Sequence, residues 1–125
     1  MHPRPTGAEL AILQVLWEHG PATVREVHER LREDKGTGYT TVLKTLQIMA
    51  DKGLVRRDET RRAHVYQAKI RRERTQSQIV REVMDRVFAG SASRLVLHAL
   101  STKRASAEEI AEIRRTLDEM EGQAE

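Results

Sequence analysis

The chain has 125 residues, a hydrophobic content of 38%, a formal net charge of +3 and no cysteine, which suits one domain or two small ones with a modest core. The lack of cysteine excludes disulfides, thiolate metal sites and cysteine nucleophiles. No apolar run approaches the ~18 residues of a membrane span and the N-terminal segment lacks the apolar core of a signal peptide, so we expect a cytoplasmic protein without a membrane partner.

The first two predicted helices open on capping boxes. Thr6 precedes Glu9, and Thr23 precedes Glu26, by the three residues that let each pair bond reciprocally at a helix start. The apolar stripes are Leu10, Leu13, Leu16 and Trp17 in the first helix, and Val24, Val27 and Leu31 in the second. The expected stops are Gly20-Pro21 and Asp34-Lys35-Gly36.

The stretch from Thr37 to Ala68 is the most informative part of the chain. A third helix begins between Thr37 and Thr40, with one of the threonines there as its cap, and stops at Gly53. Its inward residues are Val42, Leu43, Leu46 and Met49. Two strands follow over residues 54–58 and 64–68, joined by a basic turn. Helix, turn, helix and hairpin in this order predict a winged helix-turn-helix, with Trp17 and Tyr66 as large core residues.

Positive charge is concentrated on this helix and hairpin. From Lys35 to Arg72 there are ten Lys/Arg against three Asp/Glu, whereas from Ala105 to Glu125 there are two against seven. A basic excess of this kind is typical of a phosphate-binding surface, although a solvated basic face would show it too.

In a winged helix, the N-terminal half of the third helix faces base edges in the major groove. The predicted DNA-binding residues are Thr37, Tyr39, Thr40, Thr41, Lys44 and Thr45 in that helix, and Arg61, Arg62 and His64 in the wing. Threonine can bond base edges or touch a thymine methyl, and the wing cations can reach phosphates or the minor groove. Secondary candidates for backbone contact are Arg25, His28 and one of Arg56 and Arg57.

The rest of the chain, residues 71–125, is predicted to form three more helices. An amphipathic helix over 71–88 breaks at Gly90-Ser91, a short apolar helix follows, and a capping box at Ser106 opens a last helix with an a/d seam. Three helices in so few residues have little room for a core, so we expect burial against a second copy, with packing on the N-terminal half as the alternative. The expected dimerisation residues are Val83, Val87, Leu95, Leu97, Leu100, Ile110, Ile113, Leu117 and Met120.

The predicted fold class is therefore mainly α with a small two- or three-stranded β wing. It comprises a winged-helix DNA-binding domain over residues 1–70 and a three-helix dimerisation domain over residues 71–125. No two of the five histidines have ligand spacing, and no P-loop, G-x-S-x-G or G-x-G-x-x-G motif is present. We expect no enzyme activity, no cofactor and no metal site.

In this order and spacing the segments resemble the penicillinase repressor family, the BlaI/MecI/CopY-type transcriptional regulators. The resemblance runs from about Thr6 to Glu121. It is carried by TGAELAILQVLW, TVREV, GYTTVLKTLQIMADKGLVRR and RAHVYQA, and then by FAGSASRLVLHAL and AEEIAEIRRTL.

The resemblance implies a homodimeric repressor on a pseudo-palindromic operator, which in this family often controls a β-lactamase or sensor-metallopeptidase gene as part of an antibiotic response. It also implies a regulatory protease that cuts the dimerisation region. The matching bond is His98-Ala99, where the family's Asn–Phe pair is absent. Copper-sensing relatives carry a cysteine motif that this chain lacks.

Two other functions remain open from the residues alone. One is a protein-interaction adaptor whose winged helix binds a protein, and the other is a winged-helix regulator of another family that senses a small ligand between its dimerisation helices. Salt dependence separates DNA binding from the adaptor, because binding to phosphates falls steeply as salt rises.

Overall fold

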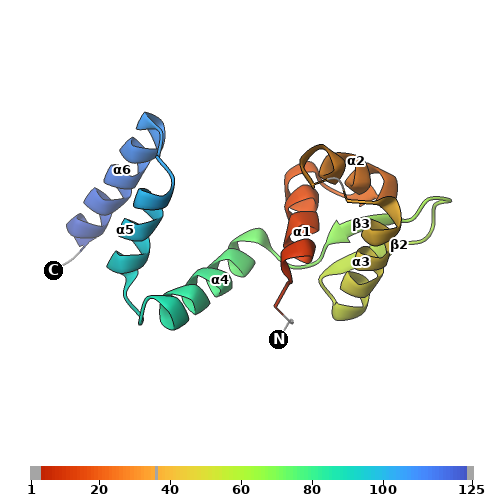
Figure 1. Cartoon of the computed structure of the whole chain (residues 1–125), viewed down its shortest axis with the longest axis horizontal. Helices are drawn as coiled ribbons and strands as arrows, with labels where there is room; N and C mark the ends of the chain where they lie inside the picture. The colour runs from red at the N-terminus through yellow and green to blue at the C-terminus, as the bar shows by residue number, and fades with distance from the viewer. Residues whose placement is uncertain (1–3, 36, 124–125) are drawn as a thin grey trace. The chain divides into compact units, whose positions relative to one another are not determined.

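The computed structural model describes residues 4–35 and 37–123, which include six helices and three short strands. The elements are α1 (Gly7–His19), β1 (Ala22–Thr23), α2 (Val24–Lys35), α3 (Tyr39–Lys52), β2 (Val55–Asp58), β3 (Val65–Ala68), α4 (Arg72–Val87), α5 (Ala92–Thr102) and α6 (Ala107–Gln123) (Figure 1). They form two compact units that divide between Ser77 and Gln78, within α4. Gly36, an expected helix stop, lies outside the described residues. None of the described helices is long and apolar enough to cross a membrane.

The predicted capping boxes of the first unit are confirmed. The Thr6 N–H donates to Glu9 Oε1 at 2.8 Å, and the Glu9 N–H donates to Thr6 Oγ1 at 3.2 Å. The same pair of bonds, with the same lengths, joins Thr23 and Glu26 at the start of α2. Each box satisfies N–H groups that a helix start leaves without intrahelical partners.

The apolar faces of α1, α2 and α3 pack with the sheet into one core. Its buried members are Ile12, Leu13, Leu16, Ala22, Val24, Val27, Leu31, Val42, Leu46, Met49, Leu54, Val55 and Tyr66. The predicted stripes are confirmed, except that Leu10, Trp17 and Leu43 are only partly buried. Ile12 is an unpredicted core residue, because α1 contacts both helices and β3 and so buries a wider face than one stripe.

The sheet has three antiparallel strands in the order β1-β3-β2. β2 pairs with β3 from Val55↔Ala68 to Asp58↔Val65, which confirms the predicted hairpin. β1 adds the third strand through Ala22↔Tyr66. The β2–β3 loop projects from the helical body of this unit (Figure 1).

The start of α3 differs from the prediction. We expected one threonine among residues 37–41 to cap the helix, but the N-cap is Gly38, and no side chain bonds to the helix start. Gly38 has an extended backbone conformation, with φ at −75°, and the helix begins at the next residue. The threonine side chains of this segment are therefore not used as caps.

The second unit buries none of its described α5 and α6 residues. Ser91 caps α5 by accepting from the Arg94 N–H at 3.2 Å, and the predicted box between Ser106 and Glu109 caps α6 with bonds of 2.9 and 3.1 Å. The large exposed apolar residues of the unit are Val80, Val87, Val96, Leu97, Leu100, Ile110, Leu117 and Met120. Leu95 and Ile113 are half-buried.

Candidate nucleic-acid interface

The N-terminal half of α3 presents a polar face to solvent. Val42, Leu46 and Met49 are each at most 1% exposed, which fixes the rotation of the helix. Because residues three and four apart share a helix face, the opposite side carries Thr40, Thr41 and Lys44, all exposed. Tyr39, at the first helical position, is 47% exposed. This is the face that a winged helix can offer to base edges.

Two threonines of the predicted set are less free to interact. The Thr45 hydroxyl donates to the Thr41 carbonyl at 2.7 Å, so it can offer a partner only its two acceptor lone pairs and its methyl group. Thr37, before the helix, is half-buried.

The wing is ordered by Asp58 at its base. Asp58 Oδ1 accepts from both the Thr60 hydroxyl, at 2.7 Å, and the Thr60 N–H, at 3.0 Å. These two bonds hold the pKa of Asp58 below its ordinary value. The turn after Asp58 is thereby fixed, and it presents Arg61 and Arg62 exposed at the tip.

Glu59 partly neutralises the charge of Arg57 and also lies near His64. It pairs with Arg57 at 3.3 Å and lies 4.0 Å from His64. Hydrogen bonding with Tyr66, the cross-strand neighbour, and then the charge of Glu59 raise the pKa of Arg57 above its ordinary value. Arg57 is therefore held on the wing strand as a fixed positive charge.

A cavity of about 450 Å³ lies between α3, the wing and the start of α2. Its lining residues are Thr23, Val24, Arg25, Tyr39, Leu43, Gln47, Arg57, Arg62, Ala63, His64 and Tyr66. Of the predicted site residues, Tyr39, Arg62 and His64 meet here. Thr40, Thr41, Lys44 and Thr45 lie on α3 outside this lining, as does Arg61 on the wing. The cavity thus gathers cationic side chains from separate segments around one side of α3.

Arg25, Gln47 and Arg57 line the cavity with side chains suited to DNA contact but were missing from the predicted principal set. Arg25 and Arg57 were secondary candidates only, and Gln47 was not considered. Gln47 stands three residues after Lys44, so the helical spacing that selected Lys44 would also have found it. Its amide can bond adenine through two atoms at once.

His28 supports the start of α3 from α2. Its ring meets the edge of Tyr39 with centroids 5.8 Å apart and planes at 79°. This edge-to-face contact restricts the Tyr39 ring beside the candidate interface.

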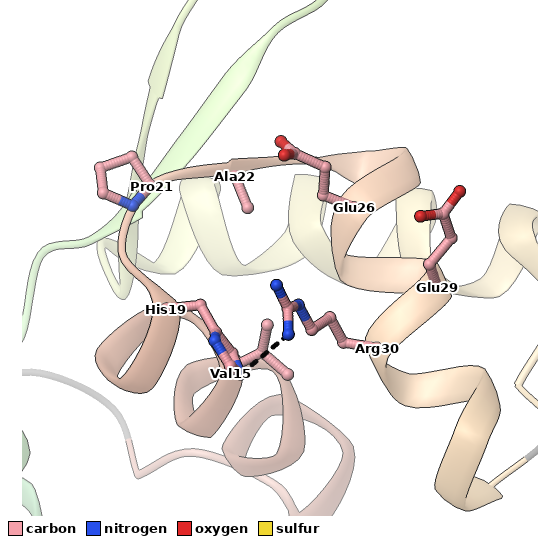
Figure 2. A pocket seen from close by; sticks show the side chains of 7 residues that line it. All are labelled: Val15, His19, Pro21, Ala22, Glu26, Glu29 and Arg30. Atoms are coloured by element: carbon pink, nitrogen blue, oxygen red, sulfur yellow. Dashed lines mark hydrogen bonds between the residues drawn. The ribbon is translucent and has the colours of Figure 1, made fainter.

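A second hollow lies between α1, β1 and α2 (Figure 2). Arg30 reaches towards His19, with 3.5 Å between Arg30 Nη1 and His19 Nε2, while Glu26 and Glu29 turn away from the pair. Glu26 is already engaged in capping α2. The hollow contains none of the predicted site residues. Among the described residues, no group of three or more His, Asp or Glu could hold a metal ion.

Three helices packed on a three-stranded sheet, with α3 following α2 closely in the chain and a basic hairpin beside α3, define a winged helix-turn-helix protein. The sequence model of the family described as penicillinase repressor matches residues 5–119. The chain belongs to the penicillinase repressor family, and the resemblance read from its motifs is confirmed.

Named relatives agree with this assignment. The chain is 33% identical over 115 residues to the transcriptional regulator BlaI of Mycobacterium tuberculosis (strain H37Rv), covering 90% of this chain and 82% of that protein. It is 26% identical over 117 residues to the penicillinase repressor of Bacillus licheniformis, covering 94% and 91%. These relatives are, by name, transcriptional regulators and repressors.

Solved structures confirm the winged-helix fold. The DNA-binding domain of the repressor BlaI, solved in solution, matches with a TM-score of 0.51 and 26% identity, over 58% of this chain and 90% of that one. A MarR family protein from Bacillus stearothermophilus matches with a TM-score of 0.50 and 22% identity, over 94% and 74%. The second likeness concerns the fold alone.

Proposed function

We propose that this protein is a transcriptional repressor that binds double-stranded operator DNA through α3 and the wing. The observation that carries the proposal is the gathering of Arg25, Arg57, Arg62 and His64 beside the exposed polar face of α3. A duplex groove lined by phosphates is the ligand that matches a polar helix flanked by cations. The names of the relatives support the same function.

Within this interface we assign two roles. Tyr39, Thr40, Thr41 and Lys44 contact base edges, and Thr45 contributes through its methyl group and its acceptor lone pairs. Arg61, Arg62 and His64, together with Thr37, contact the backbone. The uncapped start of α3 supports this division, because the N–H groups of its first turn keep their donor capacity for a phosphate.

We propose further that the protein acts as a homodimer through its second unit. Leu97 is 67% exposed, Leu117 53% and Met120 61%. A single chain would leave these large apolar side chains in contact with water. A second copy would cover these side chains with an isologous surface. The proposed dimerisation residues are Val83, Val87, Leu95, Leu97, Leu100, Ile110, Ile113, Leu117 and Met120. We place them in a dimerisation domain over residues 71–125, after a DNA-binding domain over 1–70, although residues 71–77 group with the winged-helix unit in the structure.

A two-fold dimer implies a pseudo-palindromic operator, with half-sites about one DNA turn, ~34 Å, apart. Repression is then steric, because the bound dimer excludes polymerase. By analogy with the family, the target is a β-lactamase or sensor-metallopeptidase gene, and loss of the dimer releases the DNA. A single protomer binds only one half-site and therefore lacks the avidity that the second half-site provides.

Cleavage at His98-Ala99 would require α5 to unwind. This bond lies inside the helix, and the His98 carbonyl accepts from Ser101 Oγ and Thr102 Oγ1, each at 2.8 Å. Peptidases bind substrate as an extended strand. We therefore propose that a regulatory protease acts here only after α5 unwinds around this bond.

Fluorescence anisotropy tests the function directly. The purified protein is titrated into duplex from upstream of its own gene, and into a scrambled duplex, at several salt concentrations. Tight, salt-sensitive binding that prefers the native duplex is expected. An absence of binding to either duplex at low salt would overturn the proposal and favour a protein-binding adaptor.

A further inference from the structure

The first turn of α4 is held against α1 by an aromatic contact that the DNA interface does not use. Trp17 Nε1 donates to the Ile70 carbonyl at 3.0 Å, just before α4 begins. The Arg72 guanidinium carbon lies 5.9 Å from the centre of the Trp17 ring, within cation–π range. Trp17 is the only tryptophan in the chain. We call Trp17, Ile70 and Arg72 the α4 clamp.

A buried residue one turn further along extends the attachment. Thr75 is 3% exposed, and both its N–H and its hydroxyl donate to the Arg71 carbonyl, at 3.0 and 2.9 Å. Ile70 packs against the core of the first unit. The opening of α4 is therefore part of the winged-helix body, although the helix continues into the second unit.

The clamp also has a weak point. Arg72 Nε is buried without a hydrogen-bond partner among the described residues. An unsatisfied buried N–H offsets part of the gain from the ring contact, since release of the turn would return the group to water. The clamp therefore holds the start of α4 but is less stable than the packing of the core.

We infer that Trp17 and Arg72 are positioning residues for operator binding: they fix the direction in which α4 leaves the winged-helix unit, and so set which half-site separation a dimer can span. This inference rests on the proposed dimeric DNA binding. A stiff connection restricts a bivalent protein to one separation, whereas a loose one tolerates several at lower effective concentration. Because α4 is the connection between the units, its clamped first turn decides the stiffness.

The test uses the full-length protein and three sets of duplexes. One set carries two half-sites at the native separation, a second carries them moved apart by about two and about five base pairs, and a third carries a single half-site. Affinities are measured by anisotropy for the wild type, Trp17→Phe and Arg72→Ala. Arg74→Ala is the matched control, because it removes an exposed arginine from the same turn.

The wild type should prefer the native separation strongly. Trp17→Phe, which loses the N–H donor, and Arg72→Ala should reduce that preference by about tenfold while leaving single half-site affinity unchanged. Arg74→Ala should keep the preference. Trp17 fluorescence in Arg72→Ala should shift if the ring contact is lost.

Each contrary outcome points to a different failure. A wild type that binds none of the duplexes overturns the proposed function itself. A wild type that binds but shows no preferred separation, or variants that keep the full preference, overturn the clamp alone. An equal loss on single half-sites would make the two residues merely structural, and if Trp17→Phe fails to fold, Arg72→Ala carries the same comparison.

Discussion

Lys52 Nζ donates to Glu9 Oε2 at 2.8 Å, which joins the last turn of α3 to the first turn of α1. Glu9 is only 3% exposed, and its other oxygen caps Thr6. The Glu9 carboxylate therefore takes part in the N-terminal cap of α1. It also anchors α3, the helix that we propose to lie in the DNA groove. A buried charge is tolerated when its oxygens are satisfied in this way.

Glu9→Gln should destabilise the first unit at neutral pH. Burial raises the pKa of Glu9, but hydrogen bonds from Lys52 and Thr6 outweigh it and leave the pKa below its ordinary value. A depressed folded-state pKa gives stability that is present above the unfolded pKa of 4.5 and is lost as pH falls through the folded value. The expected loss is about 1 to 2 kcal/mol at pH 7 and little at about pH 3.

Urea unfolding of both proteins across this pH range measures the difference. Other acidic groups with depressed pKa values, such as Glu26 and Asp58, affect both proteins alike and cancel. A difference that stays constant from neutral to acid pH would show that the carboxylate charge is not what stabilises this contact.

Ala89→Gly should stabilise the second unit. Ala89 is the one described non-glycine residue with a positive φ, +50°, at the end of α4. The Gly90 N–H donates to the Met84 carbonyl of α4 at 2.9 Å, which closes the turn that follows the helix. Glycine adopts this left-handed conformation without strain, so the gain should be about 1 kcal/mol. Thermal unfolding at one fixed protein concentration would reveal it, and a lower midpoint would contradict it.

Leu117→Asp should weaken the dimer and operator binding together. Leu117 is more than half exposed on α6, and we place it in the dimer seam, where a carboxylate would be buried without a partner. Sedimentation velocity and anisotropy report the two effects. Arg115→Asp is a strict control, because it introduces the same acid elsewhere on α6 with a larger change of charge. A monomeric Leu117→Asp protein that keeps full operator affinity would refute the dimer mechanism.

Arg62→Ala should weaken binding to all sequences by a similar factor. Arg62 is exposed on the wing and lines the cavity beside α3, so we expect a phosphate contact. Loss of one such contact lowers the slope of log affinity against log salt by about 1. Arg115→Ala, with an equal charge change in the second unit, should leave the slope unaltered. Selective loss for the native sequence would instead indicate base readout by Arg62.

Local signals explain which features could be predicted from the sequence. The capping boxes at Thr6, Thr23 and Ser106 join residues three apart, so their spacing is visible in the chain. β1 has only two residues and exists because it pairs with β3, more than forty positions later. No local pattern encodes such a pairing.

The candidate site likewise has one part that local sequence patterns predict and one part that depends on the tertiary fold. The exposed face of α3 follows from helical periodicity, which selected Lys44 and its neighbours. The cavity depends on how the wing folds back beside α2, which brings Arg25 and Arg57 to one place. The prediction of a threonine cap for α3 was wrong. Threonine is favoured at helix starts, but the N-cap of this helix is Gly38.

The most direct measurement compares charge reversals on α3 and on α6. Anisotropy with native duplex at one salt concentration would be recorded for the wild type, Lys44→Glu and Arg115→Glu, which make equal changes in net charge. If α3 enters the groove, Lys44→Glu should lose affinity by about tenfold or more while Arg115→Glu binds like the wild type. Equal affinity for Lys44→Glu and the wild type would contradict the proposal that α3 contacts operator DNA.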